Sequence, residues 1–418
     1  MSKHPQRAPV ELKNVRLLDP FRGVDRIGDV RLWPEGPEPI SQAGPGALDG
    51  DGRWLTPLLV DLAARLREPG ATHKASIGSE ARAALARGIG TLVLPPDTEP
   101  AIDSTAVVEL ILERAGRLDP AQAARVLPVA ALVRGHAQDQ LSEMATLAHA
   151  GCVAVGHLGK SLRNAALLRR ALQYVAGLDL TVMLQPMDAD LAEDGVAHTG
   201  RIAARLGLPG VPPSAETLIL ARDLELAEEA GARLHVCRLS TAKGVEMVAA
   251  AKTRGVAVTC DVAMHQLWFS ELDTLDLDPR FHLLPPLRRQ QDREALTEGV
   301  KSGVIDCIVS DHQPHDRDAK LAPFGLTEPG ASTLDAFLGL GLKLVHAGVL
   351  SPLGWLTRCV AAPARVVGLP ASRTGWMLLD PEVDSVQTVD SLLSRGHNSP
   401  FLGWSLPGRV DARFPFHD

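Results

Sequence analysis

A short polar stretch that follows an apolar run is the first place in the chain where chemistry could be built. Residues 58–70 read LLVDLAARLREPG, which is typical of a buried strand that ends in a turn. The two-residue period of a strand places Asp61, Ala63 and Arg65 on one side. The carboxyl end of a parallel strand is where a barrel enzyme carries its active site, yet alanine and arginine cannot bind a metal.

Asp311 is a second candidate, in a segment that reads SDHQPH after another apolar run. It could act as a general base, but an ion-pair partner for nearby arginines is the simpler interpretation. In the same way, Arg67 and Glu68 could pair with each other or cap the turn.

Histidines and a cysteine offer other sites. A new metal centre could in principle use the histidines that follow the apolar runs, but these lie on different segments without H-x-x-x-H spacing. They are His157, His235, His265, His312 and His315. Cys237 precedes an arginine and could be an activated thiol, but no general base is placed beside it, so we expect a buried core cysteine.

Strand-like and helix-like segments alternate from residue 58 onward. Eight apolar runs separated by amphipathic segments predict an α/β fold, a (β/α)8 TIM barrel. A doubly wound open sheet is weaker, because no glycine-rich phosphate-binding motif follows any strand. Short strand-like segments at both ends predict a small β-sandwich-like domain. The predicted domains are residues 1–54 with 368–418 for the β domain and 55–367 for the barrel.

Composition limits the partners and the compartment. The chain has 418 residues and a formal net charge of −7, which argues against nucleic acid or an anionic membrane as partner. No apolar run approaches the ~20 residues of a membrane span, and the first residues lack a signal-peptide core. The five scattered cysteines are expected to be buried and reduced. We therefore expect a cytoplasmic protein.

Several segments, in this order along the chain, resemble the dihydroorotases of the amidohydrolase superfamily. The resemblance covers nearly the whole chain. The segments are LREPG at 66–70, PPSAE at 212–216, LSTA at 239–242, LPPLR at 284–288, DREAL at 292–296, SDHQPH at 310–315 and NSPF at 398–401.

The resemblance implies one or two zinc ions held by a fixed ligand set, and this chain lacks most of that set. The family's first strand ends in His-x-His, and its later strands supply a carboxylate or carboxylated lysine and two further histidines. The lost ligand positions are Ala63, Arg65, His157, Gln185 and Arg238. Only Asp311 stands as the family has it, as a vestigial catalytic candidate. The resemblance implies that Arg65 and Arg238 lie near Asp311, where we expect them to replace the metal electrostatically and to balance a buried carboxylate. We therefore expect no zinc and no other cofactor.

Substrate-binding positions are mixed. The resemblance implies that Arg67 and His315 contact the substrate in active members, and both are kept here. The family's Met-Pro-Asn-Thr segment reads PPDT, so Asp97 replaces an amide, and Leu284 replaces an asparagine. An acid facing an anionic substrate opposes the arginine that would bind it.

Non-catalytic family members act in bacteria as partners of aspartate transcarbamoylase, which the resemblance implies for this chain. We expect a pseudoenzyme that serves as an assembly subunit of that enzyme in pyrimidine (UMP) biosynthesis, in a hetero-oligomer with its catalytic chain, with a homodimer left open. The alternative is an active dihydroorotase or other cyclic amidohydrolase with a rearranged metal site. A sensor that binds a pyrimidine intermediate through Arg67 and His315 is a third hypothesis.

Overall fold

The computed structural model describes residues 9–135, 139–159 and 161–414. Residues 1–8 lie outside the described part of the chain. The expectation that the first residues form no signal peptide concerns this segment. Among the described residues, no helix has both the length and the apolar character that a bilayer crossing would need.

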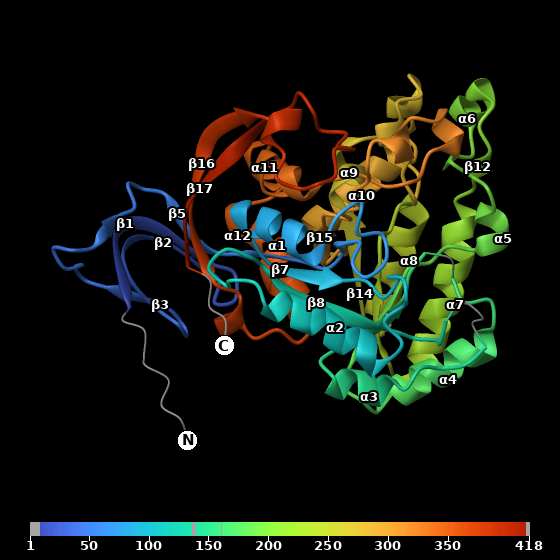
Figure 1. The fold of residues 1–418 in the computed structure, drawn as a ribbon, viewed down its shortest axis with the longest axis horizontal. Helices are drawn as coiled ribbons and strands as arrows, with labels where there is room; N and C mark the ends of the chain where they lie inside the picture. The colour runs from blue at the N-terminus through green and yellow to red at the C-terminus, as the bar shows by residue number, and fades with distance from the viewer. Residues whose placement is uncertain (1–8, 136–138, 160, 415–418) are drawn as a thin grey trace.

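Eight parallel strands form the barrel, as the alternation of segments predicted, and helices surround them (Figure 1). Each strand is a short apolar run, so side chains on both faces are buried, as parallel sheets require. In chain order, which is also their order in the sheet, the strands are β6 (Leu59–Asp61), β7 (Ile89–Leu94), β8 (Arg125–Ala131), β9 (Ala154–His157), β10 (Thr181–Leu184), β13 (Arg233–Val236), β14 (Val258–Ala263) and β15 (Cys307–Val309).

The barrel closes just beyond its first and last strands. The Arg65 N–H donates to the His312 carbonyl at 2.9 Å, and the His312 N–H donates to the Ala63 carbonyl at 3.0 Å. These bonds bridge the segments that follow β6 and β15. The closure therefore lies at the carboxyl ends of the strands, where a barrel carries its site.

Amphipathic helices pack their apolar sides on the strands. Pro213 precedes the first residue of α7, Ser214, and Gly231 ends the helix in the left-handed region at φ 64°. The longer helices are α1 (Ile77–Ala86), α2 (Thr105–Gly116), α4 (Ala165–Ala176), α7 (Ser214–Ala230), α8 (Ala242–Thr253), α10 (Gln290–Ser302) and α11 (Leu334–His346).

Shorter elements fill the connections between them. They include α3 (Met144–His149), α5 (Ala189–Ala192), α6 (Arg201–Leu206), α9 (Met264–Trp268), α12 (Pro352–Leu356), α13 (Ala362–Val366) and the paired strands β11 (Ala197–His198) and β12 (Gly210–Val211).

A seven-stranded sheet forms the extra β domain from both ends of the chain. Alternate residues of its inner strands face two cores: Leu17 packs inside the domain, and Leu18 packs on the barrel. In Figure 1 the N-terminal strands lie away from the barrel, and β16 pairs with β5 on one side and with β17 on the other. The strands are β1 (Val10–Asp19), β2 (Val24–Trp33), β3 (Gly36–Ile40), β4 (Leu48–Asp49), β5 (Trp54–Pro57), β16 (Trp376–Val386) and β17 (Ser405–Phe414).

The fold class is therefore a TIM barrel with an added β domain. The predicted domain boundaries stay a prediction. The sheet continues through Pro57, three residues into the segment that we assigned to the barrel.

Gly408 joins the two parts and should not tolerate a side chain. Its φ is +106°, and a Cβ there would lie 2.5 Å from Leu342 and 2.7 Å from Leu338 on α11. We expect Gly408→Ala to lower the free energy of unfolding by about 1–3 kcal/mol more than Gly403→Ala. Gly403 is the matched control, because its φ is +85° but its surroundings are open. Equal losses in urea denaturation would show that packing against α11 does not matter.

Candidate functional site

Four charged side chains meet at the carboxyl ends of the barrel strands. Arg65 follows β6, Asp97 follows β7, Arg238 follows β13 and Asp311 follows β15. Arg238 and Asp311 are each 2% exposed, whereas the side chains of Arg65 and Asp97 are 13% and 33% exposed, so the cluster runs from the barrel interior to its mouth. Buried charges are stable only when they are paired, so each needs the others.

Both arginines approach the buried aspartate, as we expected. Arg65 Nη1 and Arg238 Nη1 each lie 3.4 Å from the Asp311 Oδ1 atom. The other carboxylate oxygen, Oδ2, accepts a bond from Gln313 Nε2 at 3.2 Å. Asp311 is thus an ion-pair partner, which is the simpler of the two interpretations of this residue.

Arg65 also binds Asp97. Its Nε atom donates to Asp97 Oδ2 at 2.8 Å. Burial raises the pKa of Asp97, but the charge of Arg65 and this hydrogen bond outweigh burial, and the net pKa is lowered. For Arg65, burial lowers the pKa and the charges of Asp97 and Asp311 outweigh it, so the net pKa is raised. Both groups are held in their charged forms.

Three residues of this region have left-handed backbone conformations. The φ angles are +62° for Arg67, +57° for Arg238 and +47° for Asp311. Such a conformation is uncommon for a residue with a side chain, and strain of this kind clusters at functional sites. Three strained residues thus lie at the same end of the barrel as the charge cluster.

Asp61 contributes to closure of the barrel and not to the charge cluster. It is fully buried and accepts hydrogen bonds from the Ser310 N–H at 2.9 Å and from the Ser310 hydroxyl. Burial raises its pKa. Because β6 ends at Asp61, the strand period that we extended to Arg65 does not reach that far.

The residues at the family's ligand positions do not fit zinc. Ala63 has no donor atom, and the guanidinium groups of Arg65 and Arg238 have no lone pair to offer and stay protonated. Arg238 Nη2 also donates to Gln185 Oε1 at 2.7 Å. This amide oxygen therefore binds the Arg238 guanidinium and is not free to bind a metal ion. Two fixed positive charges would in addition repel a divalent ion.

Arg67 and His315 lie together, next to the charge cluster. Arg67 Nη2 is 3.1 Å from His315 Nε2, and Arg67 Nε donates to the Pro314 carbonyl at 2.9 Å. Burial first, and Arg65 second, lower the pKa of Arg67 to about 10. Burial, followed by the charge of Arg67, lowers the pKa of His315 to about 2, so this histidine is neutral.

Lys74 and Glu328 complete this group, and sequence reasoning missed both. Lys74 Nζ lies 2.6 Å from Glu328 Oε2 and 3.2 Å from His315 Nδ1. Lys74 comes four residues after the LREPG segment, which was the one signal that could have found it. No comparable signal marks Glu328, which a loop far along the chain brings into place.

Glu68 does not pair with Arg67, so that interpretation was wrong. Its Oε2 atom accepts a bond from the Ile77 N–H at 2.9 Å, and its Oε1 atom binds Arg114. Glu68 thereby accepts a hydrogen bond from an N–H group at the start of α1 that has no partner within the helix. Its negative charge also interacts favourably with the positive end of the helix dipole.

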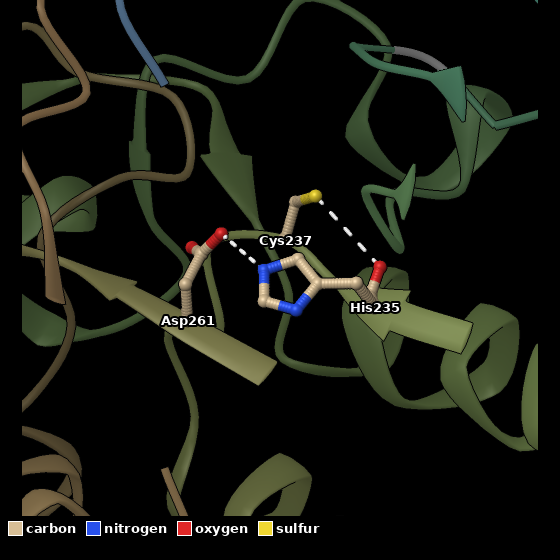
Figure 2. Close-up of side chains that lie close together, drawn as sticks. All are labelled: His235, Cys237 and Asp261. Atoms are coloured by element: carbon tan, nitrogen blue, oxygen red, sulfur yellow. Dashed lines mark hydrogen bonds and ion pairs between the residues drawn. The ribbon is translucent and has the colours of Figure 1, made fainter. Parts of the chain in front are cut away.

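The one group of potential metal ligands among the described residues is His235, Cys237 and Asp261, on β13, on the residue after it and on β14 (Figure 2). Both His235 nitrogens are already used, by Thr259 Oγ1 at 2.8 Å and by Asp261 Oδ2 at 3.0 Å. Burial raises the pKa of the Cys237 thiol well above its usual range. The group is therefore a buried hydrogen-bonded core, as we expected for Cys237.

The remaining candidate histidines do not gather into a site. His312 binds Glu80 at 2.8 Å, with both side chains fully buried. His265 is buried and its two ring nitrogens have no hydrogen-bond partner among the described residues. Burial lowers the pKa of His265 to about 4. All five cysteines are buried and free, as predicted.

Fold comparison defines the class of protein. The structure matches an L-hydantoinase (dihydropyrimidinase) from Arthrobacter aurescens with a TM-score of 0.84 at 20% identity, over 99% of this chain and 96% of that one. A dihydropyrimidinase from Brevibacillus agri matches with a TM-score of 0.83 at 17% identity, over 98% and 94%. The chain shares its fold, a TIM barrel with an added β domain, with these solved structures.

Sequence comparison defines the family. A dihydroorotase-like protein of Pseudomonas aeruginosa is 43% identical over 412 residues, covering 96% of each chain. A dihydroorotase of Trichlorobacter lovleyi is 35% identical over 408 residues, covering 95% of each. The family model for dihydro-orotase-like proteins matches residues 52–244. The chain belongs to the dihydroorotase-like family.

Removal of Arg238 should destabilise the barrel. Arg238→Met leaves a buried carboxylate with one guanidinium, so we expect the free energy of unfolding to fall by about 3–5 kcal/mol. Arg238→Met combined with Asp311→Asn should recover part of this loss in urea denaturation. Arg233→Met is the control at the start of β13, because Arg233 pairs with an Asp179 side chain that is 93% exposed. A stable Arg238→Met protein would contradict the role of this ion pair.

Acid stability should depend on the pair of Arg65 and Asp97. Because the folded pKa of Asp97 lies below the unfolded value of about 3.9, the pair stabilises the protein above that pH and stops doing so as the pH falls through the folded pKa. Between about pH 5 and pH 3 the free energy of unfolding of the unmodified protein should fall as Asp97 becomes protonated. We expect this fall to be smaller in the Arg65→Met protein, because its Asp97 no longer has the lowered pKa. Arg163→Met, which breaks an exposed pair with Asp190, should leave the pH profile unchanged. Identical profiles for all three proteins would refute this assignment.

Proposed function

We propose that this protein is a non-catalytic dihydroorotase homologue that serves as an assembly subunit of aspartate transcarbamoylase in pyrimidine biosynthesis in the cytoplasm. The observation that carries the non-catalytic part is the position of two guanidinium groups, Arg65 and Arg238, each 3.4 Å from the one retained family aspartate. The family's reaction needs a cationic metal in this place. The protein supplies its own cations instead.

The charge cluster also removes the nucleophile. Bulk water has a pKa of ~15.7, and a zinc site lowers the pKa of its bound water to ~7. An arginine offers hydrogen bonds and charge but no coordination, so it cannot form a metal hydroxide. Asp311 as a base is meanwhile occupied by two ion pairs and by Gln313.

The assembly role is supported by what the chain has kept. A dihydroorotase-like protein matches 96% of this chain at 43% identity, so the whole fold is shared with that family, while arginines stand at two of the positions where the resemblance implies zinc ligands. A fold that is retained without its chemistry implies a function carried by surfaces. The family's inactive members, as partners of a transcarbamoylase, provide the most specific hypothesis for such a function.

The alternative is an active cyclic amidohydrolase with a rearranged metal site. The observation in its favour is that proteins named dihydroorotase are 35% identical to this chain along nearly its full length. The purified chain discriminates between the two hypotheses. Stoichiometric zinc together with turnover of dihydroorotate or carbamoyl aspartate would establish the alternative, whereas trace zinc and no turnover would exclude it.

Co-expression with the transcarbamoylase catalytic chain tests the assembly role. We expect a mixed complex in size-exclusion chromatography with light scattering, and a transcarbamoylase chain that is inactive or unstable alone and recovers activity when this protein is added. An Arg238→Met protein, which is expected to be destabilised, serves as a folding-dependent control and should restore less activity. A transcarbamoylase that assembles and works fully without this chain would overturn the proposal.

A further inference from the structure

An exposed segment that combines leucines with acids follows α9 at the carboxyl end of β14. We call residues Ser270 to Leu277, which read SELDTLDL, the acidic leucine ridge. Leu272, Leu275 and Leu277 are 53%, 38% and 40% exposed. Three large exposed apolar side chains within six residues form a local concentration, whereas single exposed leucines are ordinary.

The ridge is held in a fixed shape. Ser270 and Asp273 form a reciprocal capping box, in which the Ser270 N–H donates to Asp273 Oδ2 at 2.8 Å. The Glu271 N–H donates to the Arg288 carbonyl at 2.7 Å, and the buried Thr274 hydroxyl donates to the Glu271 carbonyl at 2.6 Å. The leucines are therefore presented on an ordered support, so binding them would cost little ordering entropy.

Backbone strain fixes the exposed end of the ridge. Leu277 has a φ of +53°, a left-handed conformation that is unfavourable for a bulky side chain. A Gly or Asn would adopt this conformation more easily, and a polar residue would suit a side chain that is 40% exposed. Leu277 is thus neither a residue that adopts this backbone easily nor a polar residue suited to an exposed turn. A strained and exposed leucine points to a contact outside the monomer.

The charge of the ridge specifies its partner. Asp273 and Asp276 are exposed between the leucines, and the ridge contains no basic residue. Within the described part of the chain, neither carboxylate forms an ion pair, and the next arginine along the sequence, Arg280, is bound by Asp278. The ridge therefore presents negative charge beside apolar surface with no compensating cation from its own segment.

We propose that the acidic leucine ridge is the docking surface for a partner protein segment that carries basic side chains between apolar ones. This inference rests on the proposed function, because it assigns the transcarbamoylase chain to this surface. A second copy of the chain fits poorly, since a two-fold contact would bring identical acidic ridges together. Anionic lipid is disfavoured for the same electrostatic reason.

Variants of the ridge test the surface. We expect Leu272→Ser combined with Leu275→Ser to weaken binding of the transcarbamoylase chain at least about tenfold, as loss of buried apolar anchors does. Asp276→Lys should weaken binding and reduce its salt dependence. Leu218→Ser is the matched control, because Leu218 is 58% exposed on α7 and is not part of the ridge. Affinity is measured by calorimetry on full-length proteins with unchanged thermal stability.

The outcomes separate the two proposals. If the unmodified chain does not bind the transcarbamoylase chain, the proposed function fails. If it binds but the ridge variants bind as tightly as the Leu218→Ser control, the proposed function stands and the docking surface is overturned. If the ridge variants lose self-association but still bind the transcarbamoylase chain, the docking surface is also overturned, and the ridge is then a contact between copies of this chain.

Discussion

The carboxylate of Asp311 is the group on which the mouth of this barrel depends. It is 2% exposed and follows the last barrel strand, so it must be balanced within the protein. Arg65 from the first strand and Arg238 from the sixth provide that balance, each at 3.4 Å. Three strands that are far apart in the sequence are thereby joined electrostatically at the point where the barrel closes.

The backbone also links the closure of the barrel to the charged residues at its mouth. The segment that carries Ala63 and Arg65 exchanges main-chain hydrogen bonds with His312, the residue next to Asp311. Asp61 holds Ser310 on the other side of the same turn. These closing bonds use main-chain atoms and the Asp61 carboxylate, so they do not depend on which side chains stand at positions 63 and 65. Barrel closure and the ion pairs of Asp311 are therefore neighbours that use different atoms.

The barrel was predictable because its signal is local. Each strand is an apolar run, and each is followed by a helix of suitable length, so the alternation alone predicts parallel strands. The pairing of Arg65 and Arg238 with Asp311 was also accessible, because the resemblance to the dihydroorotases implies that these three positions surround one metal site. The contacts of Lys74 with Glu328, and of Glu68 with Arg114, depend on loop paths and long side chains, which leave no periodic trace in the sequence.

The site therefore combines a strained backbone with a network of ion pairs. Arg67, Arg238 and Asp311 have left-handed backbones that are costly for residues with side chains. Such strain persists only where the surroundings enforce it: the Arg238 N–H donates to Asp261 Oδ1 at 2.6 Å, and Arg67 Nε donates to the Pro314 carbonyl at 2.9 Å. Asp311 stands between Ser310 and His312, whose hydrogen bonds close the barrel, so the closing contacts also fix the position of its carboxylate. Arg65 and Arg238 then make this buried carboxylate compatible with a stable fold.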